Sequence, residues 1–92
     1  MSGKVRDYPK LAHDILEAVG GEKNVASAAR CATRLRLVLR ENDPQAKQTV
    51  SAMPGVITVV ENGGQFQVVI GQHVGEVYDE FAKLVQLDEQ ED

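Results

Sequence analysis

A strict alternation of leucine and arginine in the middle of the chain sets the strongest limit on the fold. Residues 34–40 read Arg-Leu-Arg-Leu-Val-Leu-Arg, so the three leucines fall on one side of an extended strand. Arginine occupies three of the four positions on the other side. One apolar face and one polar face are typical of an antiparallel sheet that is packed on a single side. We therefore expect helices to cover the leucine side.

The rest of the chain supplies the other elements of such a fold. Apolar residues at helical spacing begin at Tyr8 and stop at Gly20-Gly21, and Asp43-Pro44 is a suitable cap and first turn for a second helix. The predicted order is helix, two strands, helix, two strands, helix, at residues 8–19, 25–31, 34–40, 44–53, 56–60, 66–70 and 74–85. This order predicts an α+β fold, a two-layer sandwich in which a four-stranded antiparallel sheet carries its helices on one face.

The length of 92 residues predicts one domain. We expect this domain to span residues 8–87, between a flexible N-terminal segment at 1–7 and, at 88–92, an acidic tail or the start of an interdomain linker. No apolar run approaches the roughly 20 residues that cross a bilayer, and the start lacks the apolar core of a signal peptide. We expect a soluble, cytoplasmic domain.

Cysteine and histidine are too few to suggest a metal site. Cys31 is the single cysteine, so it has no partner for an internal disulfide, and only His13 and His73 accompany it as ligand types that zinc favours. We therefore expect no metal and no other cofactor. His73 follows the last predicted strand, where a histidine is often an exposed cap, although it could also reach a phosphate or a partner at that edge of the sheet.

Cys31 lies inside a locally basic segment of an acidic chain. The net charge is −4, yet four of the five arginines fall between Arg30 and Arg40, a window without any acid. A lone cysteine is usually a small buried hydrophobe. Here it ends one predicted strand and precedes a turn of small and polar residues, which indicates an exposed thiol. Nearby cations lower the pKa of a thiol, and the thiolate is the nucleophile.

The residues after Cys31 are suited to holding a phosphoryl group on its sulfur. A tight turn through Ala32 and Thr33 can direct backbone N–H groups at an anion, and the Thr33 hydroxyl is a further donor. Arg34 and Arg36 share one face of the next strand, and guanidinium groups match phosphate oxygens. Arg40 is explained equally well as a solvated side chain.

The segment Cys-Ala-Thr-Arg-Leu-Arg at 31–36 resembles the signature of the IIB domains of the bacterial sugar phosphotransferase system, of the glucose and sucrose type. Further similarity lies at Val19-Gly20-Gly21 with Asn24, at Pro54-Gly55-Val56 and at 64–71. It covers the chain from about Tyr8 to Leu87. The stretch 60–66 most resembles members that serve β-glucosides.

This resemblance implies a relay of phosphate to an incoming sugar. A phosphohistidine of a IIA domain would phosphorylate Cys31, which would pass the group to a sugar, a β-glucoside for this branch, held by a membrane IIC domain. Arg34 and Arg36 become the pair that supports transfer, while Thr33 and the backbone at Ala32 cradle the phosphate. The domain would then act as a sugar phosphotransferase component tethered to a permease, at the cytoplasmic face of the inner membrane.

Two other classes of protein could use the same residues. A cysteine phosphatase also needs an activated thiolate and an arginine, but its usual loop places the arginine six positions after the cysteine, where this chain has Leu37. A nucleic-acid-binding module could use the basic segment, although that segment contains no aromatic residue on which bases could stack.

Overall fold

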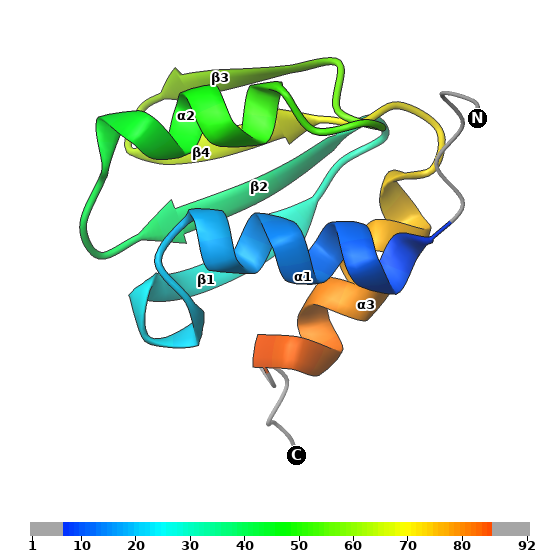
Figure 1. Ribbon diagram of the computed structural model, residues 1–92, viewed down its shortest axis with the longest axis horizontal. Coiled ribbons are helices and arrows are strands. Elements are labelled where there is room, and N and C mark those ends of the chain that lie inside the picture. Colours follow the sequence, from blue (N-terminus) through cyan, green and yellow to red (C-terminus); the bar gives the residue numbers. More distant parts are fainter. Residues whose placement is uncertain (1–6, 86–92) are drawn as a thin grey trace.

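The computed structural model describes residues 7–85, and the predicted terminal segments lie outside this range except for Asp7. Its helices are α1 (Tyr8–Ala18), α2 (Pro44–Ser51) and α3 (Val74–Val85), and its strands are β1 (Val25–Arg30), β2 (Arg34–Leu39), β3 (Thr58–Asn62) and β4 (Gln65–Val69). The strands form one antiparallel sheet in the order β1-β2-β4-β3. The helices lie together on one face of this sheet (Figure 1). The predicted α+β fold is confirmed.

Side-chain caps explain where the first two helices begin. The Asp7 carboxylate accepts a hydrogen bond from the Lys10 backbone N–H at 3.1 Å, and Asp43 accepts one from the N–H of Gln45 at 2.9 Å. Each aspartate is followed closely by a proline, which cannot donate a backbone hydrogen bond and suits the first turn of a helix. The chain therefore specifies these two helix starts locally.

The leucine face of β2 forms the centre of the core. Leu35 and Leu37 are completely buried, and each such side chain stabilises the fold by about 1.5–3 kcal/mol through the removal of apolar surface from water. Phe66 and Val68 of β4 are buried on the same side. The residues that complete this core come from all three helices and the remaining strands: Leu11, Ala12, Ile15, Leu16, Val19, Val25, Ala46, Val50, Val59, Phe66, Val68, Ile70, Val74, Val77, Phe81 and Val85.

The structure corrects several predicted boundaries in the middle of the chain. The third strand begins at Thr58 rather than at residue 56, because the turn at Gly55, where φ is 94°, is followed by two connecting residues before regular pairing starts. The second helix ends at Ser51, so Met53 follows it and packs against the core from the connecting segment. A hairpin turn joins β3 to β4, with Gly63 and Gly64 both at positive φ.

Asn24 joins three segments of the chain, of which the one after β2 is 17 residues away in sequence. Its side-chain nitrogen donates to the carbonyl oxygens of Val19 at 2.6 Å and Glu41 at 2.8 Å, and its oxygen accepts from the Glu41 N–H at 2.8 Å. Gly20 packs against this amide so closely that a Cβ there would lie 2.9 Å from the Asn24 nitrogen. One side chain therefore links the end of α1, the start of β1 and the segment after β2.

We expect Asn24→Ala to lower the free energy of unfolding by roughly 2–3 kcal/mol, since it removes three hydrogen bonds worth about 1 kcal/mol each. Urea denaturation measures this loss. Asn42→Ala is the matched control, because Asn42 is exposed and its replacement is expected to change stability by less than about 0.5 kcal/mol. Equal effects of the two substitutions would contradict the linking role of Asn24.

Candidate active site

The turn that joins β1 to β2 holds the cysteine at one end of the sheet. The Cys31 N–H donates to the Arg34 carbonyl at 3.0 Å, which closes the turn. The Thr33 carbonyl accepts from two N–H groups in the segment after β4, those of Ile70 at 2.9 Å and Gly71 at 3.0 Å. These bonds attach the turn to the neighbouring strand and leave the sulfur of Cys31 partly exposed.

Three donors surround the sulfur and stabilise its ionised form. Hydrogen bonds from the backbone N–H of Thr33, the backbone N–H of Arg34 and the guanidinium of Arg36, in order of effect, lower the pKa of the Cys31 thiol from 9.0 to about 7. The positive charge of Arg36 adds to this, while partial burial of the sulfur acts in the opposite direction. At neutral pH about half of the molecules therefore carry a thiolate.

The backbone at Ala32 and Thr33 is predicted to cradle a phosphoryl group, and this stays a prediction. The N–H groups that reach the sulfur itself are those of Thr33 and Arg34. Ala32 and Thr33 are both exposed at the surface of the turn. The structure thus brings Cys31, Thr33, Arg34 and Arg36 together and places Ala32 at the tip.

The two arginines of the predicted pair have different contacts. The Arg36 guanidinium reaches the sulfur, and its Nε atom is buried without a hydrogen-bond partner among the described residues. The Arg34 guanidinium instead donates from Nη1 to the side-chain oxygen of Gln67 on β4, at 2.7 Å. Sequence reasoning missed Gln67. Its position on the open face of β4 was a possible signal, but the pairing of β4 with β2 cannot be read from the chain.

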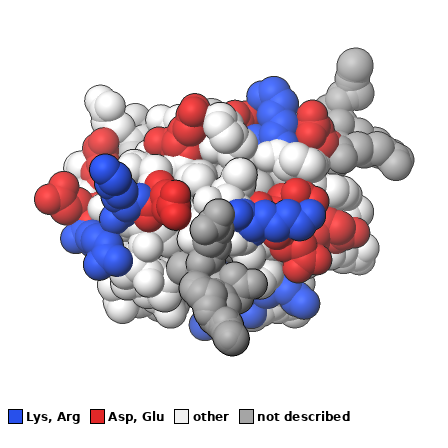
Figure 2. Space-filling model, turned by 90° about the horizontal axis from the view of Figure 1, so that it is seen from below, with Lys and Arg blue, Asp and Glu red and all other residues white. Residues whose placement is uncertain are grey.

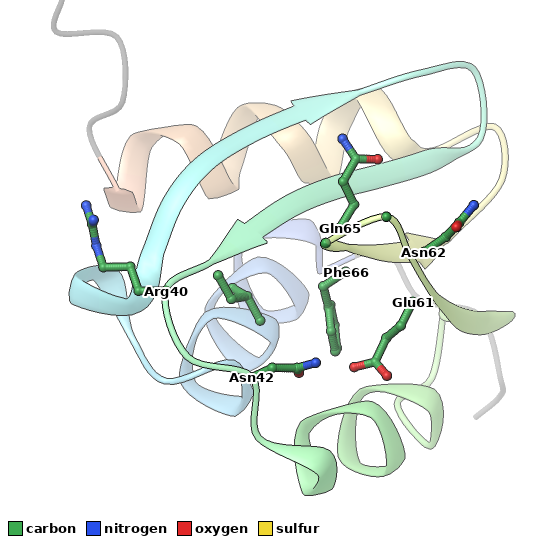
Figure 3. A pocket seen from close by; sticks show the side chains of 9 residues that line it. Arg40, Asn42, Glu61, Asn62, Gln65 and Phe66 are labelled. Carbon is green, nitrogen blue, oxygen red and sulfur yellow. The ribbon is translucent and has the colours of Figure 1, made fainter.

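Arg40 lies far from Cys31, so the basic segment does not form one patch. β2 separates the two residues by roughly 20 Å, at about 3.3 Å for each strand residue. The Arg40 Nε donates to the Lys23 carbonyl at 3.0 Å. Arg40 is one of the residues around a pocket of about 340 Å³ at this far end of the sheet, where Asn42, Glu61 and Phe66 point into a common space (Figure 3).

His73 lies at the start of α3 and contacts the first helix. Its carbonyl accepts hydrogen bonds from the N–H groups of Glu76 and Val77, and its ring nitrogen Nδ1 lies 2.9 Å from the Tyr8 hydroxyl. This exposed histidine therefore links α1 to α3 close to the segment that holds the Cys31 turn. Within residues 7–85, no three side chains of His, Cys, Asp or Glu are grouped as a metal ion would require.

The structure also bears on the two rival functions. Leu37, which occupies the position of a phosphatase arginine, is completely buried on the helix side of β2. On the face that Figure 2 shows, Lys and Arg side chains stand beside Asp and Glu side chains rather than in a continuous basic surface. The burial of Leu37 counts against a phosphatase loop.

Comparison with known proteins identifies the family. The family model of the phosphotransferase system EIIB domain matches residues 13–44. The beta-glucoside-specific EIIBCA component of the PTS system from Dickeya chrysanthemi is 46% identical over 85% of this chain, and the sucrose-specific EIIBC component from Bacillus subtilis is 36% identical over 92%. A crystal structure described as one domain of the PTS system IIabc component from Clostridium difficile matches with a TM-score of 0.75 and 32% identity, over 84% of this chain and 81% of that one.

The chain belongs to the EIIB family of the phosphotransferase system. The family predicted from the sequence is thereby confirmed. This EIIB chain spans 12% of the length of the Dickeya relative and 19% of the Bacillus one. In the part that the structure describes, no helix combines the length and the apolar character that a membrane crossing requires. The segment that matches the family model contains the whole turn and β2, and hence every predicted site residue of the EIIB chain.

We expect the alkylation rate of Cys31 by iodoacetamide to follow the thiolate fraction, with a midpoint at a pH of about 7. Arg36→Gln removes one donor and one positive charge, so the midpoint rises, but it stays below 9.0 because both backbone donors remain. Arg40→Gln, at the other end of the strand, leaves the midpoint unchanged. An unaltered midpoint in Arg36→Gln would show that this guanidinium does not stabilise the thiolate.

Proposed function

We propose that this chain is a phosphoryl carrier in sugar uptake. Cys31 takes a phosphoryl group from a phosphohistidine of a IIA domain and gives it to a sugar bound by a membrane IIC domain. The observation that carries the proposal is the environment of the sulfur, where two backbone N–H groups and one guanidinium favour the thiolate at neutral pH. Such a sulfur is nucleophilic without any metal or cofactor.

The site suits both halves of the transfer. In the first step the thiolate attacks phosphorus, so the S–P bond forms and the N–P bond to the donor histidine breaks. In the second step a sugar hydroxyl attacks phosphorus, the S–P bond breaks to regenerate the Cys31 thiolate, and the hydroxyl proton passes to solvent. The donors that stabilise the thiolate of Cys31 make it a good leaving group in this second step. Arg34 and Arg36 can neutralise the negative charge on the phosphoryl oxygens while the group is transferred.

The names of the relatives support the proposed partners and substrate. Three relatives described as beta-glucoside-specific EIIBCA components are 43–46% identical to this chain, and four described as sucrose-specific EIIBC components are 36–42% identical. We therefore propose a β-glucoside as the acceptor, with residues 8–87 as the carrier domain. A site of this kind would work at the cytoplasmic face of the membrane, tethered to its permease.

We expect incubation with a phosphorylated IIA domain to place one phosphoryl group on Cys31, located by mass spectrometry of the intact and digested chain. Cys31→Ser abolishes the label because the hydroxyl stays protonated near neutral pH. His73→Gln is the control and keeps the label, since His73 is bonded to Tyr8 rather than to the sulfur. A phosphoserine, or a label that survives Cys31→Ser, would overturn the proposed carrier role.

Arg34→Lys and Arg36→Lys are expected to accept phosphate but to transfer it to sugar more slowly, by roughly 10–100-fold. An ammonium group lacks the planar pair of donors, and the loss of a charge-assisted hydrogen bond costs about 1.5–3 kcal/mol. Single-turnover transfer to a β-glucoside, in membrane vesicles whose permease lacks its own EIIB cysteine, measures the effect. Arg40→Lys is the matched control. Equal loss in both steps would indicate a folding defect instead.

A further inference from the structure

Gln67 is a buried amide in the middle of the otherwise open face of the sheet. Among the described residues it is the one polar side chain in the buried class, with 5% of its surface exposed. In the sheet register Gln67 of β4 pairs directly with Arg36. Arg34 pairs with Val69, which lies two residues after Gln67 on the same strand. Residues at alternate strand positions share a face, so Gln67 lies on the same face as both arginines.

Two hydrogen bonds fix the orientation of this amide. The Gln67 side-chain oxygen accepts from Arg34 Nη1 at 2.7 Å, and its nitrogen donates to the side-chain oxygen of Gln65 at 2.9 Å. An amide has one accepting and one donating end. If the Gln67 amide turned over, its NH₂ group would face the guanidinium, and the bond to Gln65 would be lost as well. Gln65 therefore keeps the accepting end of Gln67 toward Arg34.

A phosphoryl group on Cys31 needs more donors than the thiolate does. The two backbone N–H groups and Arg36 already serve the sulfur, whereas a phosphoryl group brings three strongly accepting oxygens. The Arg34 side chain starts from the same face of β2 as that of Arg36 and makes no contact that stabilises the thiolate. A free arginine side chain would occupy many rotamers, and its bond to Gln67 restricts it to a few.

We propose that Gln67 is a positioning residue: it holds the guanidinium of Arg34 beside that of Arg36, ready for the oxygens of a phosphoryl group on Cys31. The inference rests on the proposed carrier function. It assigns a role in that function to a residue outside the 31–36 segment. Gln67 acts through Arg34 and does not touch the reacting atoms. Its influence falls on the phosphorylated state and on the step that discharges it, because the thiolate has its own donors.

Gln67→Met tests this role, since methionine has a similar length and lacks the accepting oxygen. In single-turnover measurements we expect phosphorylation of Cys31 by the IIA domain to stay within about twofold of the parent chain. Transfer from Cys31 to a β-glucoside, in the same vesicles, falls roughly tenfold, as for the loss of one hydrogen bond to a charged group. Gln48→Met, the same change at an exposed site on α2, leaves both steps unaltered.

Two further readouts separate positioning from a general structural role. Gln67→Met causes no additional loss in an Arg34→Lys background, because Gln67 acts through that guanidinium. The alkylation midpoint of Cys31 stays at about 7 in Gln67→Met. Additive losses, a shifted midpoint, or equal slowing of both steps would overturn the inference.

A second variant covers the case in which Gln67→Met fails to fold. If Gln67→Met does not fold, Gln65→Met takes its place in the test. This change keeps the Gln67 oxygen that accepts from Arg34 and removes only the bond that orients the Gln67 amide. A selective two- to threefold loss of sugar transfer is then expected. No selective loss in that variant would overturn the role of Gln67. Failure of the parent chain to be labelled on Cys31 would instead overturn the carrier function itself.

Discussion

The two-faced character of β2 is the constraint on which the rest of the structure depends. β2 lies inside the sheet, between β1 and β4, so its register is fixed on both sides. Its leucines, Leu35 and Leu37, anchor the helix layer, and this anchoring directs Arg34 and Arg36 to the opposite face. A slip of one residue would exchange the two faces and bury the arginines. The same hydrophobic burial that stabilises the fold therefore also orients the candidate site.

The activation of Cys31 depends more on backbone geometry than on the arginines that first draw attention to it. The backbone N–H groups of Thr33 and Arg34 contribute most to the lowered thiol pKa, and Arg36 follows. Their directions are set by the turn, and Thr33 is attached to β4 through its carbonyl. Backbone donors lose little conformational entropy when they bind an anion, because the fold already holds them in place. A preformed site of this kind suits the proposed carrier role, in which phosphate is gained and lost repeatedly.

The arginines between residues 30 and 40 show how sequence proximity differs from spatial proximity. An extended strand carries Arg40 to the far end of the sheet, where it contacts Lys23. Gln67 is 33 positions away from Arg34 in the chain yet within 2.7 Å of its guanidinium. The extension of one strand separates Arg40 from Cys31, whereas cross-strand pairing, which no local pattern encodes, brings Gln67 to Arg34.

The sequence by itself determined the α+β element order and the faces of β2, and it pointed to Cys31 as the candidate reactive group, because these follow from local periodicity, caps and residue chemistry. It also placed Arg34 and Arg36 on one face. Only the tertiary structure decided which N–H groups reach the sulfur, that the two arginines have separate partners, and that Gln67 of β4 lies opposite Arg36 on β2. These features depend on turn geometry and on the pairing of β2 with β4, which arise when segments distant in the chain bury their apolar faces together.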